Sequence, residues 1–171
     1  MPDADPRRLL VAGVGAATLM QVATIGADGF PAICQVWFQP RFDPDRLRFL
    51  SREDREHTVN LRRDPRVAAS IALEVPAGLG ERVRGVSLSG LAREIPEAEL
   101  PAATEAFIDR WPRAAAALRP KPRPSPSGPV PRPGGPALNP RSRLYEITVA
   151  HWVLFDEVNF PAQPRLLVPA T

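Results

Sequence analysis

The chain has 171 residues, of which 44% are hydrophobic and 24% are charged, so it fits one folded domain and is not disordered throughout. Its 22 basic residues nearly balance its 19 acidic ones. Four of the basic residues lie in one proline-rich segment, so the rest of the chain is near neutral and we expect no nucleic-acid-binding face.

Short apolar runs alternate with turn signals along the chain, a pattern typical of a small β protein. We predict six strands, at residues 18–25, 32–39, 46–51, 67–75, 83–95 and 144–156. The first two join at Asp28-Gly29, because an Asp-Gly pair favours the tight turn of a hairpin. Gly85 and Gly90 mark bulges or close backbone approaches in the fifth strand. The side chains predicted to point inward from the third and last strands are Leu47, Phe49, Tyr145, Ile147, Val149 and Trp152.

Three further segments are predicted to be helical. Residues 6–15 form a short helix that ends at its two glycines, and residues 52–64 form a second one that Pro65 closes. Residues 96–118 form a third, with prolines near its ends. Six antiparallel strands with helices at the periphery predict a mainly β fold, a small six-stranded β-barrel.

Proline divides the chain into three parts. Nine of its 22 prolines fall in residues 119–140, which we interpret as a linker or loop that favours an extended polyproline conformation. Residues 1–118 are then the first part of the barrel domain, and residues 141–171 supply its last strand and a C-terminal tail. Arg123, Pro126 and Pro129 have the spacing of peptides that dock in aromatic grooves, which leaves partner binding as an alternative.

The chain has too few cysteine and histidine side chains for several kinds of site. Cys34 is the only cysteine, so there is no disulfide framework, and with only His57 and His151 beside it no zinc site is expected. A cytoplasmic setting follows as the default expectation. The apolar run at residues 9–20 is too short to cross a bilayer, so no membrane association is expected.

The most informative cluster of polar residues lies at the end of the third strand. Ser51 ends that strand, Arg52 follows, and a helix is expected to begin at about Asp54. Arg55 and His57 then lie near the positive end of a helix, which outlines a phosphate-binding site. The alternative is that the charged run is a solvated helix whose acidic and basic residues pair with one another.

The order of parts from residue 19 to 95 resembles the pyridoxamine 5'-phosphate oxidase-like family of flavin-binding split barrels. The stretches that carry the resemblance are residues 22–25, 28–31, 36–38, 47–51, 57–67 and 84–92. Residues 144–160 also resemble the last strand of an uncharacterised bacterial branch. The resemblance implies an antiparallel split β-barrel that forms a homodimer, with flavin mononucleotide (FMN) at the interface between the two chains.

The same resemblance implies which residues meet the cofactor. Ser51 and His57 match phosphate-contacting positions, and the strand at residues 35–37 runs beneath the isoalloxazine ring. The implied cofactor-binding set is Gln35, Val36, Trp37, Ser51, Arg52, Arg55, His57 and Gly85. Glu56 stands where the pyridoxamine phosphate oxidases carry arginine, and their C-terminal signature is absent, so vitamin B6 synthesis is not predicted.

The leading hypothesis is therefore a homodimeric FMN-binding flavoprotein, an oxidoreductase that acts on an unknown small molecule. No side chain is an evident catalytic acid or base, so catalytic residues stay unassigned. A deazaflavin or haem in the same fold is one alternative, with His57 and His151 as the only imidazole ligands. A non-enzymatic binding or scaffold protein is the other. We expect the dimer because Val36, Trp37 and Phe38 would otherwise form a half-exposed apolar wall.

Overall fold

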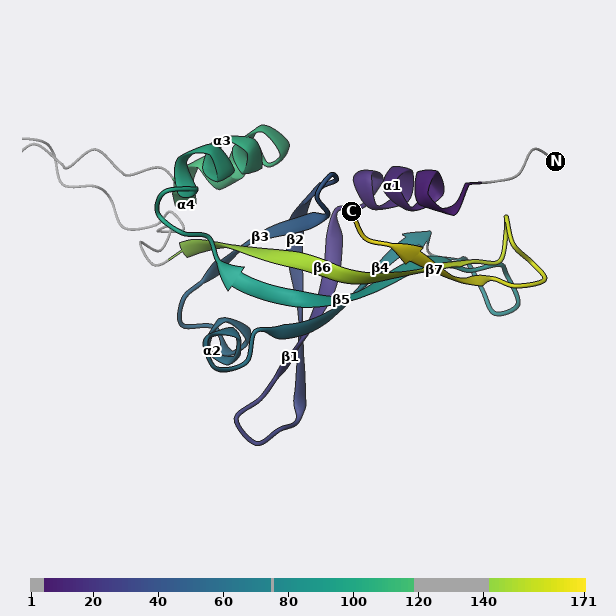
Figure 1. The fold of residues 1–171 in the computed structure, drawn as a ribbon, viewed down its shortest axis with the longest axis horizontal. Helices are drawn as coiled ribbons and strands as arrows, with labels where there is room; N and C mark the ends of the chain where they lie inside the picture. Colours follow the sequence, from purple (N-terminus) through teal and green to yellow (C-terminus); the bar gives the residue numbers. More distant parts are fainter. Residues whose placement is uncertain (1–4, 75, 119–141) are drawn as a thin grey trace, which may run out of the picture.

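Seven strands form one antiparallel sheet that closes on itself (Figure 1). The computed structural model describes residues 5–74, 76–118 and 142–171. The strands are β1 (Leu19–Ile25), β2 (Pro31–Arg41), β3 (Arg46–Arg52), β4 (Arg66–Glu74), β5 (Arg84–Glu94), β6 (Ser142–Asp156) and β7 (Arg165–Pro169). Their order is β3-β2-β1-β4-β5-β6-β7, and β3 also pairs with β6. Strands β1 to β6 therefore form a closed antiparallel barrel, which confirms the predicted mainly β fold with six strands. Strand β7 is an additional strand that pairs with β6.

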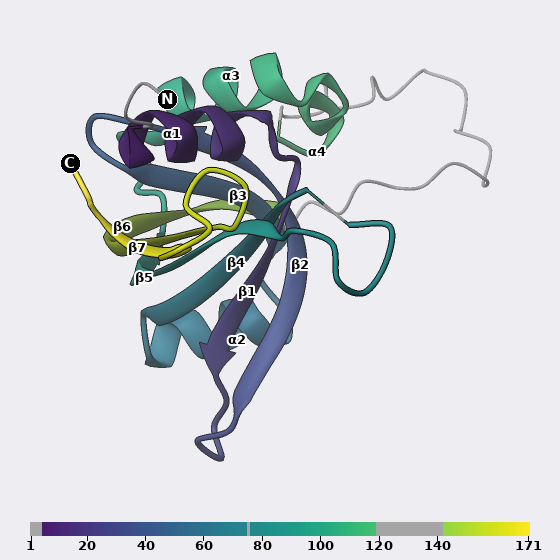
Figure 2. The same cartoon turned by 90° about the vertical axis from the view of Figure 1, so that its right-hand side faces the viewer.

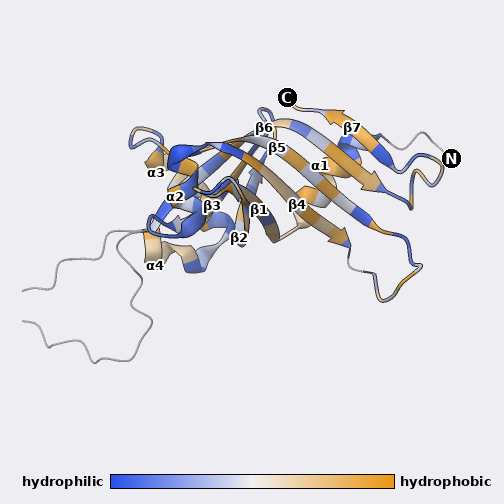
Figure 3. Ribbon diagram, turned by 90° about the horizontal axis from the view of Figure 1, so that it is seen from below, coloured by the Kyte–Doolittle hydropathy of each residue, from blue (hydrophilic) through white to orange (hydrophobic). Residues whose placement is uncertain are grey.

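The helices lie outside this barrel. They are α1 (Pro6–Ala16), α2 (Glu56–Arg63), α3 (Leu100–Arg110), the short 3-10 helix η1 (Pro112–Ala114) and α4 (Ala115–Leu118). Figure 2 shows α1 and α3 together on one side of the barrel and α2 on the opposite side. Figure 3 shows α2 as largely hydrophilic, whereas hydrophobic positions recur along β4 and β5. No helix among these described residues is long and apolar enough to cross a membrane.

All three predicted helices have boundaries that differ from the sequence prediction. The predicted helix at residues 96–118 breaks at Trp111, because Pro112 disfavours helical backbone in the residue before it. Helix α2 begins at Glu56 rather than Asp54, after a turn in which the Arg55 N–H donates to the Arg52 carbonyl at 3.2 Å. Helix α1 continues through its glycines to Ala16.

The six side chains predicted to point inward are all buried, with exposed fractions of 6% or less. The inward-facing residues of β6 are irregularly spaced, because β6 carries one extra residue opposite β5. This residue lies between the pairs Val149–Gly90 and His151–Ser89. This β-bulge switches the inward side of β6 from odd to even positions, so Val149 and Trp152 both face the core. At Gly90 the strands approach so closely that a Cβ would lie 2.2 Å from the Thr148 carbonyl oxygen. The sequence-based prediction of a bulge or close approach is confirmed at Gly90.

A buried carboxylate ties the two ends of the described chain to the barrel. Asp45 lies in the turn between β2 and β3, and both of its oxygens accept hydrogen bonds at 2.6 Å from the Arg7 guanidinium of α1. The Trp152 indole N–H of β6 donates to the same carboxylate, also at 2.6 Å. The Asp45 N–H donates to the carbonyl of Thr171, the last residue, which lies beside α1 in Figure 1. Asp45 thus joins α1, β6 and Thr171, which are far apart in the sequence.

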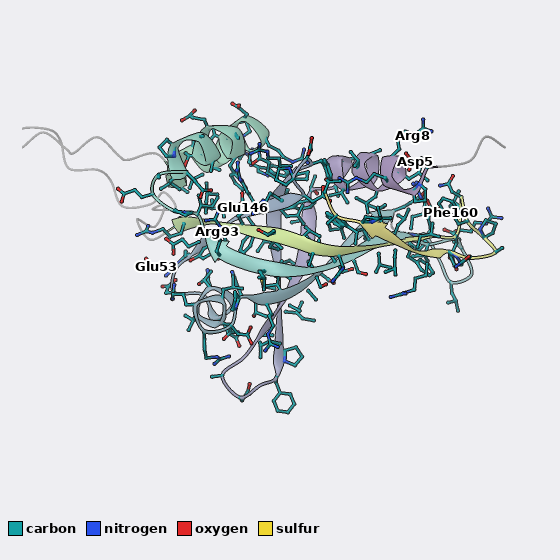
Figure 4. All side chains as sticks on the ribbon, in the orientation of Figure 1. Asp5, Arg8, Glu53, Arg93, Glu146 and Phe160 are labelled. Carbon is teal, nitrogen blue, oxygen red and sulfur yellow. The ribbon has the colours of Figure 1, made fainter. Side chains whose placement is uncertain are left out.

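A second buried carboxylate lies on the outer face of the barrel. Glu146 of β6 is 3% exposed, and its oxygens contact the guanidinium groups of Arg48 at 2.9 Å and Arg93 at 3.5 Å. Figure 4 shows Arg93 and Glu146 adjacent to each other. Arg93 also pairs with Glu99, the N-cap residue of α3, at 2.9 Å. These contacts anchor the start of α3 to the barrel.

Candidate functional site

The barrel opens between β2 and β3. These strands form only four residue pairs, from Arg41–Arg46 to Phe38–Phe49, although β2 extends back to Pro31 and β3 forward to Arg52. Beyond Phe38–Phe49 the two strands separate, while β2 stays paired with β1 and β3 stays paired with β6. We call this opening the split.

A pocket of about 490 Å³ occupies the split. Its lining consists of Cys34, Gln35, Val36, Trp37, Leu50, Ser51, Arg55, Glu56 and His57. Six of the eight residues that the family resemblance implied therefore lie together. The size is within the range of pockets that hold small molecules and cofactors.

One wall of the split offers backbone hydrogen-bonding groups. The Phe38 N–H donates at 3.4 Å to the carbonyl of Thr18, the residue just before the neighbouring strand β1. Because backbone groups alternate sides along an antiparallel strand, the N–H and C=O groups of Trp37 and Gln35 turn away from β1, toward the split. A flat ring with polar atoms along its edge would contact these N–H and C=O groups if it lay in the split.

The opposite end of the split carries a hydroxyl and an imidazole. Ser51 Oγ and His57 Nε2 are 2.7 Å apart, a hydrogen bond whose donor depends on the imidazole tautomer. Burial, and then the positive charge of Arg55, lower the pKa of His57 from its usual 6.5, while Glu56 opposes the shift. The imidazole is therefore mainly neutral at pH 7, and an anion placed beside it would favour its protonated form.

Arg55 supplies an available positive charge at this end. It is exposed, it is the N-cap residue of α2, and it forms no ion pair with any part of the chain that the structure describes. The free N–H groups of a helix start add positive potential at the same place. Ser51, Arg55 and His57 together can bind an anionic group such as a phosphate.

Two of the implied residues do not line the split. The Arg52 guanidinium is held by Asp54, with Nε 2.9 Å from Oδ1, and Arg52 is not part of the pocket lining. Gly85 lies on β5, opposite Ala72 of β4 and Phe155 of β6. A contact between Gly85 and the cofactor stays an untested prediction.

Three lining residues were not predicted from the sequence. Leu50 precedes Ser51 on β3, and Glu56 begins α2. Cys34 is half-buried, and burial, with a further contribution from Glu56, raises the pKa of its thiol. The alternation of β2 places Cys34 on the same side as Val36, but nothing in the sequence shows that β3 leaves this side open.

The predicted wall of Val36, Trp37 and Phe38 is wrong as stated. Successive residues of a strand point to opposite faces, so Val36 and Phe38 are buried in the barrel and only Trp37, 56% exposed, faces outward. Over the described ranges 5–74, 76–118 and 142–171, no group of three or more histidine, cysteine, aspartate or glutamate side chains could hold a metal ion.

Comparison with known families identifies the class of the fold. The family model named Pyridoxamine 5'-phosphate oxidase matches residues 9–154. The chain therefore belongs to the pyridoxamine 5'-phosphate oxidase-like split-barrel family. No curated protein matches the chain.

Three solved structures illustrate the range of proteins with this fold. A haem-binding protein from Mycobacterium smegmatis is 15% identical, with a TM-score of 0.72 over 99% of this chain and 60% of its own. The protein Atu2129 of unknown function from Agrobacterium tumefaciens is 21% identical, with a TM-score of 0.65 over 97% and 63%. An F420 reductase is 20% identical, with a TM-score of 0.52 over 83% and 94%. The chain spans less than two thirds of the first two, and at these identities the likeness concerns the fold.

Proposed function

We propose that the chain binds FMN in the split and serves as a flavoprotein oxidoreductase for a small molecule. The observation that carries this proposal is the hydrogen bond between Ser51 and His57 at one end of the split, beside Arg55. The backbone of Gln35 and Trp37 forms the side wall of the same split. FMN carries an anionic phosphate and a flat ring with polar atoms along its edge. It therefore needs these two environments a short distance apart.

The residues of the chain would bind and orient the cofactor. Ser51, Arg55 and His57 would hold the phosphate, and the backbone of Gln35 and Trp37 would meet the edge of the ring. The bound flavin supplies electron or hydride transfer. Glu56, in the same lining, places a negative charge near the phosphate and would weaken its binding.

Haem and F420 are the competing cofactors, since fold relatives include a haem-binding protein and an F420 reductase. Haem needs a side chain free to bind iron. In the split, His57 Nε2 is engaged by Ser51, and the raised pKa of Cys34 keeps its thiol protonated. The exposed His151 lies on β6, outside the pocket lining. These contacts favour a flavin over haem, and F420, a deazaflavin, is the second candidate.

The non-enzymatic alternative depends on the proline-rich residues 119–140. That segment, with its predicted polyproline conformation and docking pattern, lies outside the residues that the structure describes. The proposal therefore rests on the split alone.

A cofactor titration tests this choice. The purified chain is titrated separately with FMN, F420 and haem, following flavin fluorescence and the absorption spectrum. We expect FMN to bind at one per chain with quenched fluorescence. A haem absorption band without flavin quenching, or tighter binding of F420, would select a competing cofactor, and no binding of any of the three would refute the proposal.

Removing the phosphate contacts is expected to affect FMN selectively. Arg55→Ala and His57→Ala should each weaken FMN by about tenfold or more, because a charge-assisted hydrogen bond contributes about 1.5–3 kcal/mol, and should barely change riboflavin, which lacks the phosphate. Fluorescence quenching measures both affinities. Arg52→Ala is the matched control, since that arginine does not line the split. Equal losses for both ligands would mean that the variants act through folding.

We also propose that two chains associate through the outer face of β2, β1 and β4. The central part of this face carries no charged side chain, and its members are Leu19, Gln21, Ala23, Ile33, Gln35, Ala68, Ser70 and Ala72. Leu19 and Ile33 are 42% and 70% exposed there. A face with an uncharged centre that adjoins the split suits a two-fold partner, because the same patch can then cover itself.

A single charge should break this association. Ile33→Asp is expected to convert a dimer into a monomer in sedimentation at micromolar concentration, with little change in melting temperature, because the side chain is exposed in one chain. Leu167→Asp is the control, since Leu167 is 74% exposed on β7, away from this face. A wild-type monomer, or a dimer that survives Ile33→Asp, would contradict the proposed interface.

A further inference from the structure

A second and larger cavity lies between the helices α3 to α4 and the barrel wall. Its volume is about 710 Å³, within the range of pockets that enclose small ligands. The lining consists of Trp37, Leu50, Phe107, Trp111, Pro112 and Arg113, with two alanines of η1 and α4. It is apolar except for the Arg113 guanidinium. We call it the aromatic pocket.

The aromatic wall of this pocket is held in place by its surroundings. The Trp111 indole N–H donates to the Phe38 carbonyl at 3.0 Å. The Arg110 guanidinium lies 5.2 Å from the Trp111 ring centre and donates to the carbonyls of Gly15 and Ala17. A ring fixed in this way needs no rearrangement when a ligand arrives.

The two indoles form a corner. The Trp37 and Trp111 rings are 5.1 Å apart at 71°, an edge-to-face arrangement, and Trp37 is still 56% exposed. A large exposed aromatic surface beside a cavity is a usual mark of a binding site. A flat aromatic molecule can stack on one indole while its edge meets the other.

Arg113 supplies the one charge in the lining. It is exposed and forms no ion pair within the described part of the chain. A guanidinium at the border of an apolar cavity selects ligands with a carboxylate or a similar anionic group, because its planar donors match that geometry.

The aromatic pocket is continuous with the split, since Trp37 and Leu50 line both. We propose that it binds flat, apolar aromatic molecules that carry one acidic group, and that these are the substrate class of the protein. The assignment as substrate rests on the flavin-type cofactor proposed for the split, because a molecule in the aromatic pocket then lies next to that cofactor.

Two fluorescent probes test the pocket without the cofactor. 8-Anilinonaphthalene-1-sulfonate is aromatic and anionic, and N-phenyl-1-naphthylamine is its uncharged counterpart. Ala117→Phe places a ring in the cavity and is expected to weaken both probes by at least about tenfold. Arg113→Gln should weaken the sulfonate by about two- to fivefold, as for an exposed ion pair, and leave the uncharged probe unchanged.

Matched controls separate the pocket from other apolar surfaces and from folding. Leu167→Ala removes an exposed apolar side chain on β7 and should leave both probes unaffected. Melting temperatures of all variants report folding. If Ala117→Phe folds and binds both probes as the wild type does, the proposal is wrong. It is also wrong if Ala117→Phe dissociates a dimer, since a second chain would then occupy the pocket.

FMN titration of the same variants distinguishes failure of this inference from failure of the proposed function. We expect Ala117→Phe to bind FMN like the wild type. If it loses FMN and both probes together, the aromatic pocket holds the cofactor and not the substrate. If the probes behave as predicted but no variant binds FMN, the pocket stands as a site for aromatic acids and the flavin proposal fails.

Discussion

Replacing Asp45 with alanine is expected to lower the free energy of unfolding by about 3 kcal/mol, because it removes a buried carboxylate that accepts hydrogen bonds from a partly exposed arginine and a buried indole. The Arg7 guanidinium and the Trp152 indole N–H would both lose their acceptor. Urea denaturation at pH 7 measures the change. Arg52→Ala is the control, since it removes an exposed ion pair with Asp54 and should have little effect. A similar small effect of both variants would show that Asp45 does not join the two chain ends.

The same carboxylate should contribute to acid denaturation. Burial alone would raise the pKa of Asp45, but the hydrogen bonds from Arg7 and Trp152 outweigh it and hold the pKa below the usual 3.8. The stabilisation is therefore present above pH 3.8 and is lost as the pH falls through the lower pKa of the folded protein. Asp45→Asn cannot titrate, so it should lose less stability than the wild type between pH 5 and pH 2, about the window of this titration. An equal loss in both proteins would contradict this role.

Gly90→Ala is the second change with a large expected effect. A Cβ at Gly90 would lie 2.2 Å from the Thr148 carbonyl oxygen, so the backbone of β6 would have to move and the bulge would be lost. We expect a loss of about 3 kcal/mol or more in the free energy of unfolding, at the upper end of overpacking substitutions.

Gly85→Ala on the same strand is the matched comparison. The nearest atom to its Cβ would be the Ile71 carbonyl oxygen at 3.4 Å, an almost ordinary contact. We expect a loss well below that of Gly90→Ala in thermal and urea denaturation. Equal effects would mean that glycine matters in β5 for its flexibility and not for the close approach to β6.

The barrel could be predicted from the sequence because its signals are local. The Asp28-Gly29 turn and the alternation of apolar residues in each strand predict the hairpin and the inward side chains directly. Gly90 on β5 marks the place where the neighbouring strand β6 bulges. Strand β7 was missed, because its five residues follow Pro164 and end in Pro169, which is too short a pattern to indicate a strand. The Asp45 cluster was also missed, since its partners lie 38 to 126 residues away.

The candidate site could be predicted only in part. Ser51 lies near the end of β3, and Arg55 and His57 lie at the start of α2 a few residues later, so the local sequence already places them near one another. The split itself depends on where two strands stop pairing, which a single sequence does not encode in any local pattern. The aromatic pocket was missed for a related reason, because Trp37 and Trp111 meet only through the packing of α3 on the barrel.

The affinity of the wild-type chain for FMN relative to riboflavin is the measurement that tests the proposed site most directly. The two ligands share the ring, so their ratio isolates the phosphate site formed by Ser51, Arg55 and His57. We predict that FMN binds at one per chain and at least about tenfold more tightly than riboflavin, as charge-assisted hydrogen bonds to a phosphate require. Equal affinities, or tighter binding of riboflavin, would contradict a phosphate site in the split.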